Sequence, residues 1–221
     1  MAYASPGNGP SSMETVPLLE GSTSAAAAEY SAPSMTFLIR PYDGFTSRLK
    51  ALAKTNSSPR VLVEGPYGTT HSLDTFDDVL FIVGGSGIAA PLAYLADLNA
   101  STRVRSVRIV WSLREVSFAD EVLKCDMGTA FQKGKVVVDM FLTRGLGDGN
   151  VMEWPKEVNV VTGRPDVTAE IQSSAQGAVG GRLAVVACGP ARMADDSRAA
   201  VVGVLGQGFH RVEYFQEAFN W

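Results

Sequence analysis

Short apolar runs alternate with helix-like windows over the last two thirds of the chain. The runs cover residues 79–83, 107–112, 135–141 and 183–188. The windows between and after them, which suit helices, cover residues 89–98, 118–125, 167–175 and 193–206. Such short apolar runs are typical of parallel strands buried on both faces, and their alternation with helices favours βαβ units. The pattern therefore predicts an α/β fold, a doubly wound parallel sheet, over residues 77–221.

The first 76 residues have a different character. Of residues 1–35, 23 are Ala, Ser, Gly, Pro or Thr, which predicts a disordered low-complexity segment with no targeting signal. A second stretch, up to residue 76, precedes the α/β domain. Its predicted elements are strands at 35–40 and 60–64, a helix at 46–53 and the turn Gly65-Pro66-Tyr67-Gly68.

Composition and charge exclude several classes of protein. With 46% hydrophobic and 19% charged residues, the 221-residue chain can bury a sizeable core. Its apolar runs are far shorter than the roughly 20 residues of a membrane-spanning helix. The net charge of −4 gives no basic footprint for nucleic acid. Two cysteines and two histidines are too few for a disulfide framework, and we expect neither a metal site nor a haem site within this chain.

A glycine-rich turn follows the first apolar run of the α/β domain. The sequence there is Gly84-Gly85-Ser86-Gly87-Ile88, directly before a predicted helix. A strand that enters a helix through such a turn directs backbone N–H groups and the helix dipole at one place, which suits a pyrophosphate. The alternative is a tight strand-to-helix turn that needs glycine without any ligand.

The end of the next strand carries Ser112, Arg114 and Glu115. In dinucleotide-binding folds this position selects the cofactor, because a ribose hydroxyl favours an acidic acceptor and a 2′-phosphate favours arginine. Arg114, aided by Ser112, favours NADPH. The alternative is a solvated pair of Arg114 and Glu115 at the start of a helix.

Two further loops and the C-terminus carry candidate residues. Gly163-Arg164-Pro165, followed by Asp166, offers a guanidinium for phosphate or adenine and a cap for the next helix. Cys188-Gly189-Pro190 follows a buried run, where Cys188 could equally be a small core residue. The tail ends in Phe219 and Trp221, whose rings suit a flavin or nicotinamide, although a strand packed on the core would also explain them.

Taken together, six short motifs resemble the C-terminal cytosolic part of fungal ferric reductases, relatives of the NADPH oxidases within the ferredoxin reductase superfamily. In chain order they are Val-Glu-Gly-Pro-Tyr-Gly at 63–68, Gly-Gly-Ser-Gly-Ile at 84–88, Trp-x-x-Arg-Glu at 111–115, Gly-Arg-Pro-Asp at 163–166, Cys-Gly-Pro at 188–190 and the aromatic tail. The resemblance implies the end of an antiparallel flavin-binding β-barrel at residues 36–76 and an NADPH-binding domain at 77–221.

The resemblance also implies a role for each motif. The FAD side would be held by Asp43, Gly44, Thr46, Gly65, Pro66, Tyr67 and Gly68. The NADPH pyrophosphate would lie on Gly84, Gly85, Ser86, Gly87 and Ile88, the 2′-phosphate on Arg114, and the adenosine side on Gly163, Arg164 and Pro165. Cys188, Gly189 and Pro190 would line the nicotinamide, and Phe219 or Trp221 would stack on the flavin.

The family's transmembrane helices, haem-ligating histidines and His-Pro-Phe-Thr type flavin motif are not found in this sequence. We therefore expect a fragment of a protein at the cytosolic face of the plasma membrane, with haem only in the missing membrane part. Its expected activity passes a hydride from NADPH to FAD, and electrons onward toward haem and Fe(III). Alternatives are a truncated, non-catalytic nucleotide-binding module and a superoxide-generating reductase of the NADPH oxidase type. The terminal acceptor, a ferric chelate, a cupric ion or oxygen, stays open.

Overall fold

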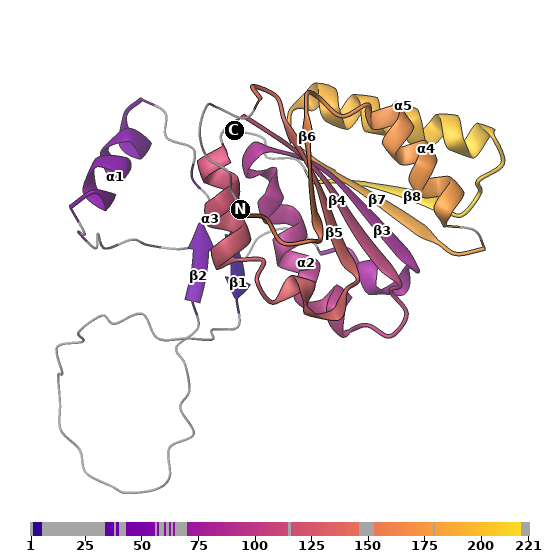
Figure 1. Cartoon of the computed structure of the whole chain (residues 1–221), viewed down its shortest axis with the longest axis horizontal. Coiled ribbons are helices and arrows are strands. Elements are labelled where there is room, and N and C mark those ends of the chain that lie inside the picture. Colours follow the sequence, from indigo (N-terminus) through magenta and orange to yellow (C-terminus); the bar gives the residue numbers. More distant parts are fainter. Residues whose placement is uncertain are drawn as a thin grey trace, which may run out of the picture.

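In the computed structural model, the apolar runs form a six-stranded sheet in which every neighbouring pair of strands is parallel (Figure 1). The strands are β3 (Asp78–Gly84), β4 (Ser106–Leu113), β5 (Val136–Leu142), β6 (Val158–Thr162), β7 (Leu183–Cys188) and β8 (Val212–Gln216). Their order across the sheet is β6-β5-β4-β3-β7-β8. The predicted doubly wound parallel sheet is confirmed.

The structure describes residues 2–5, 34–37, 39, 43–55, 57, 60, 62, 64, 70–114, 116–145, 153–178 and 180–217. None of the helices within these residues is long and apolar enough to cross a membrane.

Helices cover both faces of the sheet (Figure 1). On one face lie α2 (Ala89–Ala100) and α3 (Val116–Cys125), and on the other lie α4 (Val167–Gly177) and α5 (Ala191–Gly206). The central strand β3 supplies both cores, because Phe81 packs toward α2 and Leu80 and Ile82 pack on the opposite side. Single turns of 3-10 helix occur at Leu73–Thr75, Gly85–Ile88 and Ala130–Lys133.

The order of the strands creates a switch point beside β3. From β3 the chain moves outward through β4 and β5 to β6, and then returns to the other side of β3 to form β7. Connections on the two sides of β3 therefore diverge, and a crevice opens at the carboxyl ends of the strands. In open α/β sheets this crevice is where ligands bind.

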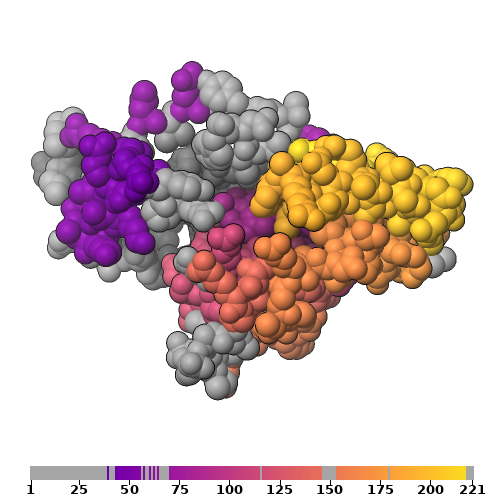
Figure 2. Space-filling model, turned by 90° about the horizontal axis from the view of Figure 1, so that it is seen from above, coloured from indigo at the N-terminus to yellow at the C-terminus, as the bar shows by residue number. Residues whose placement is uncertain are grey.

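The N-terminal part lies outside the main sheet (Figure 1). Strands β1 (Ala2–Ser5) and β2 (Ser34–Phe37) form a two-stranded antiparallel ribbon, so the stretch predicted as a low-complexity segment begins with a paired strand. Helix α1 (Phe45–Ala53) buries none of its residues, and Figure 2 shows it at the opposite end of the molecule from α5. That residues 36–76 are the end of a flavin barrel stays a prediction.

The predicted strand at 60–64 is absent at the positions that the structure describes. Arg60, Leu62 and Glu64 are not part of a strand, and Leu62 is 98% exposed. A five-residue segment cannot hold an extended pairing without a partner strand and a core to cover its apolar residues.

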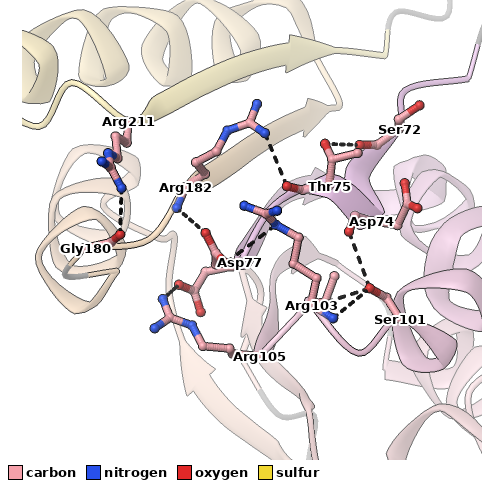
Figure 3. A network of polar contacts seen from close by, with 12 residues as sticks. Ser72, Asp74, Thr75, Asp77, Ser101, Arg103, Arg105, Gly180, Arg182 and Arg211 are labelled. Atoms are coloured by element: carbon pink, nitrogen blue, oxygen red, sulfur yellow. Dashed lines mark hydrogen bonds and ion pairs between the residues drawn. The ribbon is translucent and has the colours of Figure 1, made fainter.

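Charged side chains connect the loops at the amino end of the sheet, opposite the crevice (Figure 3). Asp77 accepts the backbone N–H of Arg182 at 2.7 Å, and its other oxygen lies 3.6 Å from Arg103. Arg105 forms an ion pair with Asp78. The hydrogen bond from Arg182 and the nearby arginines lower the pKa of the Asp77 carboxyl below its ordinary value of about 4.

Asp77 should therefore contribute stability that is present above pH 4 and lost as the pH falls through its lowered folded-state pKa. Asp77→Asn should be less stable than the wild type near neutral pH, and its stability should fall less steeply below about pH 4. Urea unfolding of both proteins at several pH values measures this difference. Parallel curves for the two proteins would contradict the role of Asp77.

Candidate functional site

A cleft of about 800 Å³ opens at the carboxyl ends of the strands beside the switch point. Its walls come from the turn after β3 at 84–86, the end of β4 at 112–114, the loop before α4 at 164–165, and the start of α5 at Pro190. Four segments that are distant in the sequence thus meet around one space. Each of these segments was predicted to bind the nucleotide.

The glycines of the turn after β3 are needed for different reasons. Gly85 has a φ of +53°, which favours glycine, and a Cβ placed on it would meet nothing within 4 Å. A Cβ on Gly87 would lie 2.2 Å from the carbonyl oxygen of Cys188, and one on Gly84 would lie 3.0 Å from Pro190. Gly87 is therefore required for close packing of the turn against β7, whereas Gly85 leaves open space at the cleft.

The side chain of Trp111 supports this turn from the core of the sheet. Its side chain is fully buried, and its indole Nε1 donates a hydrogen bond to the carbonyl oxygen of Gly85 at 2.9 Å. The ring of Phe118 packs edge-on against it, with centroids 5.8 Å apart. The sequence analysis used Trp111 only as part of a motif and assigned it no function. The available signal was a single tryptophan in a run whose other buried residues are aliphatic.

The cleft has a strongly cationic lining. Four basic residues line it, and Asp196 is the one acidic residue among the described residues of the lining; the basic residues are Lys50, Arg114, Arg164 and Arg192. Arg192 lies 3.8 Å from Asp196 in a weak ion pair. Arg114 and Arg164 are exposed and make no ion pair with any residue that the structure describes. Glu115, the alternative partner of Arg114, lies outside the described residues. Two guanidinium groups without an ion pair in one cleft suit an anionic ligand.

The loop before α4 combines a constrained turn with a helix cap. Gly163 has a φ of +118°, which other residues rarely adopt, and the next two residues, Arg164 and Pro165, line the cleft. The side chain of Asp166 accepts the backbone N–H of Ala169 at 3.1 Å and so caps α4, as the sequence predicted. The cap fixes the direction in which the loop leaves the sheet.

The loop after β7 divides its residues between the core and the cleft. Cys188 ends β7 and is fully buried, and it is not among the residues that line the cleft, whereas Pro190 is. Burial, with a smaller effect of the Glu217 carboxylate, raises the pKa of the Cys188 thiol to about 12. A Cβ on Gly189 would lie 2.8 Å from the sulfur of Met193. Cys188 is thus a neutral thiol behind the cleft wall.

The two cysteines should differ sharply in reactivity. Cys188 is buried, whereas Cys125 is exposed at the end of α3. We expect a disulfide reagent to modify one thiol of the native protein, and both thiols only after denaturation, because burial denies the reagent access to Cys188. Thiol counting on the wild type and on Cys125→Ser tests this. Rapid modification of native Cys125→Ser would contradict the burial of Cys188.

The structure does not describe every residue predicted for the flavin side. Asp43, Gly44 and Thr46 lie at the start of α1, where Gly44 has a φ of +88°. Further along α1, Lys50 reaches the cleft. The remaining predicted flavin residues, Gly65, Pro66, Tyr67, Gly68, Phe219 and Trp221, lie outside the described residues, and their roles stay predictions.

The curated relatives that match this chain are ferric reductases. The chain is 26% identical over 212 residues to a probable ferric reductase transmembrane component of Candida albicans, covering 81% of this chain and 32% of the relative. It is 27% identical over 180 residues to ferric reductase transmembrane component 6 of Saccharomyces cerevisiae, covering 73% of this chain and 25% of the relative. The chain thus spans about a third or less of the length of these relatives.

Among solved structures, the fold is similar to a flavohemoglobin from Malassezia yamatoensis with bound FAD and heme. The TM-score is 0.53 at 20% sequence identity, over 84% of this chain and 44% of the flavohemoglobin chain. The family model described as the ferric reductase NAD binding domain matches residues 76–202, which begin just before β3 and end within α5. Because this match covers more than half of the residues of the chain, the chain belongs to the family of ferric reductase NAD-binding domains.

Proposed function

We propose that this chain is the NADPH-binding portion of a ferric-chelate reductase-like flavoprotein. In the whole protein, NADPH supplies a hydride to FAD, and electrons pass onward toward haem and Fe(III) at a membrane. The residues of this chain bind and orient the nucleotide. The relatives' names as ferric reductase transmembrane components support the reaction and the membrane context.

The observation that carries the proposal is the pair of free arginines on the cleft. Arg114 follows β4, the strand whose end selects between NADPH and NADH in dinucleotide-binding folds. Among the described residues that line the cleft, the one acidic side chain is Asp196, which pairs with Arg192. Arg114, with the partly exposed Ser112 near it, suits the 2′-phosphate of NADPH. Arg164, in the loop before α4, suits the adenosine side, since a guanidinium can pair with phosphate or stack on a ring.

The turn after β3 fits the pyrophosphate. Gly85 leaves room for a ligand to approach the backbone, and the N-terminus of the following helical segment begins there. The hydrogen bond from Trp111 keeps the Gly85 carbonyl oxygen directed into the protein, away from the phosphate oxygens that it would repel. Ser86 is exposed beside it and can donate its hydroxyl.

The nicotinamide end would then lie toward Pro190 and the end of β7. The neutral thiol of Cys188 would lie behind the cleft wall there as a packing residue and would not act as a nucleophile. Phe219 or Trp221 would stack on the flavin.

Titration of the purified chain with NADPH and NADH tests the proposal. We expect NADPH to bind more tightly by about 10-fold to 150-fold, the value of one charge-assisted contact. The preference should shrink as salt is raised, because both arginines are exposed. Equal affinity for the two dinucleotides at low salt would contradict the assignment of Arg114.

A non-catalytic nucleotide-binding module is the second candidate. It is favoured by two observations on the described part of residues 36–76. Helix α1 buries none of its residues, and the buried residues Leu73 and Phe76 belong to the core of the α/β sheet. The flavin content of the purified chain, measured by its visible absorbance after incubation with FAD and desalting, separates the two. Retained flavin that NADPH reduces supports the reductase, and binding of NADPH without retained flavin supports the module.

A further inference from the structure

Three neighbouring strands carry polar side chains on the face of the sheet that packs against α4. Arg108 lies on β4, Asp139 on β5 and Asn159 on β6. The Nε of Arg108 donates to Oδ2 of Asp139 at 2.6 Å, and the side-chain amide of Asn159 donates to Oδ1 at 2.8 Å. Asp139 is 8% exposed, so both oxygens of a largely buried carboxylate have a partner. These side chains join the three strands in addition to the backbone pairing.

Arg108 also joins the sheet to α4. Its Nη2 lies 2.6 Å from Oε2 of Glu170, and its Nη1 lies 3.5 Å from the hydroxyl oxygen of Ser174. Burial opposes the charge of Arg108, but the Asp139 and Glu170 carboxylates raise the pKa of its guanidinium above the ordinary value. The guanidinium therefore stays charged in both ion pairs. We call Arg108, Asp139, Asn159, Glu170 and Ser174 the Arg108 network.

The network holds α4 next to the loop that carries Arg164. Glu170 lies in the first turn of α4, where its backbone N–H donates to the carbonyl oxygen of the N-cap residue Asp166 at 2.9 Å. At the other end of the loop, the backbone N–H of Gly163 donates to the carbonyl oxygen of Leu142 at 3.0 Å. Arg164, which lines the cleft, lies between these two anchors. A shift of α4 along the sheet would therefore move Arg164.

The network also connects the two segments that supply the arginines proposed to bind the nucleotide. Strand β4 carries Arg108 and leads directly into Arg114. Helix α4 carries Glu170 and follows the loop with Arg164. The ion pair between Arg108 and Glu170 thus fixes the placement of one segment relative to the other.

Stability alone does not require charges between α4 and the sheet. Ile171 and Ala175 of α4 are already buried in the core. Apolar contacts are non-directional, and apolar residues of similar volume often replace a buried ionic group without loss of stability. A satisfied polar network instead fixes one geometry. We propose that Arg108 and Glu170 are positioning residues, which hold α4 on the sheet so that Arg164 can bind the adenosine side of the nucleotide. This inference rests on the proposed function, because it concerns a nucleotide bound in the cleft.

A double-mutant cycle tests whether Glu170 acts through Arg164. The ligand is 2′,5′-ADP, which carries the adenosine with its 2′-phosphate and has no nicotinamide. We expect Glu170→Ala, which leaves Arg108 paired with Asp139, to reduce the affinity by about 2-fold to 12-fold, the value of one hydrogen bond. Arg164→Ala should reduce the affinity by at least as much, and adding Glu170→Ala to it should have no further effect. Calorimetric titration of the full chain in its four forms gives the affinities.

Two further variants serve as controls. Glu170→Gln keeps an acceptor oxygen for Arg108 and should bind 2′,5′-ADP nearly as the wild type does. Glu213→Ala removes an ion pair of similar length, 2.7 Å, from Arg182 at the amino end of the sheet, and should leave the affinity unchanged (Figure 3 shows Arg182). The proposal would be overturned by a wild-type affinity in Glu170→Ala or Arg164→Ala. Equal losses from Glu170→Ala with and without Arg164, or a comparable loss in Glu213→Ala, would overturn it as well.

Amide chemical shifts test the position of the loop without relying on affinity. At saturating 2′,5′-ADP, the ligand-induced shift of the Arg164 amide should be smaller in Glu170→Ala than in the wild type, with the shifts of Gly85 and Arg114 retained. An unchanged shift at Arg164, or an equal reduction at all three amides, would overturn the proposal. If Glu170→Ala fails to fold, Glu170→Asp, which keeps the charge on a shorter side chain, replaces it in the same cycle. Failure of 2′,5′-ADP to bind the wild type would instead contradict the proposed function, so the two failures are distinguishable.

Discussion

Gly87→Ala should destabilise the fold by about 3 kcal/mol, near the upper end of the usual cost of overpacking. The added Cβ would lie 2.2 Å from the carbonyl oxygen of Cys188 and 3.0 Å from its carbonyl carbon. These are backbone atoms of a buried central strand, so they cannot move aside as the end of a flexible side chain can. Urea unfolding of the variant measures the loss.

Two other glycines provide controls for this substitution. Gly203 lies within α5 with open space around its Cβ position, so Gly203→Ala should be neutral or stabilise the protein by up to about 1 kcal/mol. Gly85→Ala should cost about 1 to 2 kcal/mol, because of its positive φ, and should weaken nucleotide binding. A Gly87→Ala protein as stable as the wild type would contradict the close packing of the turn against β7.

Arg114→Ala should reduce the affinity for NADPH by about 10-fold to 150-fold and leave the affinity for NADH nearly unchanged. The reason is that Arg114 has no ion pair with another described residue, so its charge is available to a 2′-phosphate. Its exposure also means that its removal leaves no buried partner unpaired, and thermal stability should change little. Titrations with both dinucleotides, together with melting curves, measure these effects.

Arg211→Ala is the control for this prediction. Arg211 is exposed at the amino end of the sheet, far from the cleft, where its side chain donates to the carbonyl oxygen of Gly180 (Figure 3). Its removal should leave the preference between the two dinucleotides unchanged. A fall in NADH affinity as large as that in NADPH affinity for Arg114→Ala would show that Arg114 does not act through the 2′-phosphate.

The buried centre of the sheet was predictable from the sequence because its strands are apolar on both faces. The run at 79–83 became β3 and that at 183–188 became β7 with almost the same bounds. The edge strand β6 was not among the predicted apolar runs. Only Val158 of its residues is buried, and Val161 is 42% exposed, so its composition carries a weak signal.

The candidate site was predictable as motifs but not as an arrangement of side chains. The sequence indicated Arg114 and Arg164, and the sheet order then brought both to one cleft. The packing role of Gly87 and the support from Trp111 depend on neighbours across the fold, and no local pattern reports them. The same holds for Arg108 and Glu170, which are remote in sequence and meet only because α4 packs on the sheet.

The central claim is that a 2′-phosphorylated nucleotide binds in the cleft between the ends of β3, β4 and β7. Amide chemical-shift mapping with 2′,5′-ADP tests it most directly, because it locates the ligand without requiring flavin or turnover. The largest shifts are expected at Gly85, Ser86, Arg114 and Arg164, with none at the amino end around Asp77 and Arg182. Saturable shifts confined to that amino end, or no shifts at ligand concentrations in the millimolar range, would contradict the account.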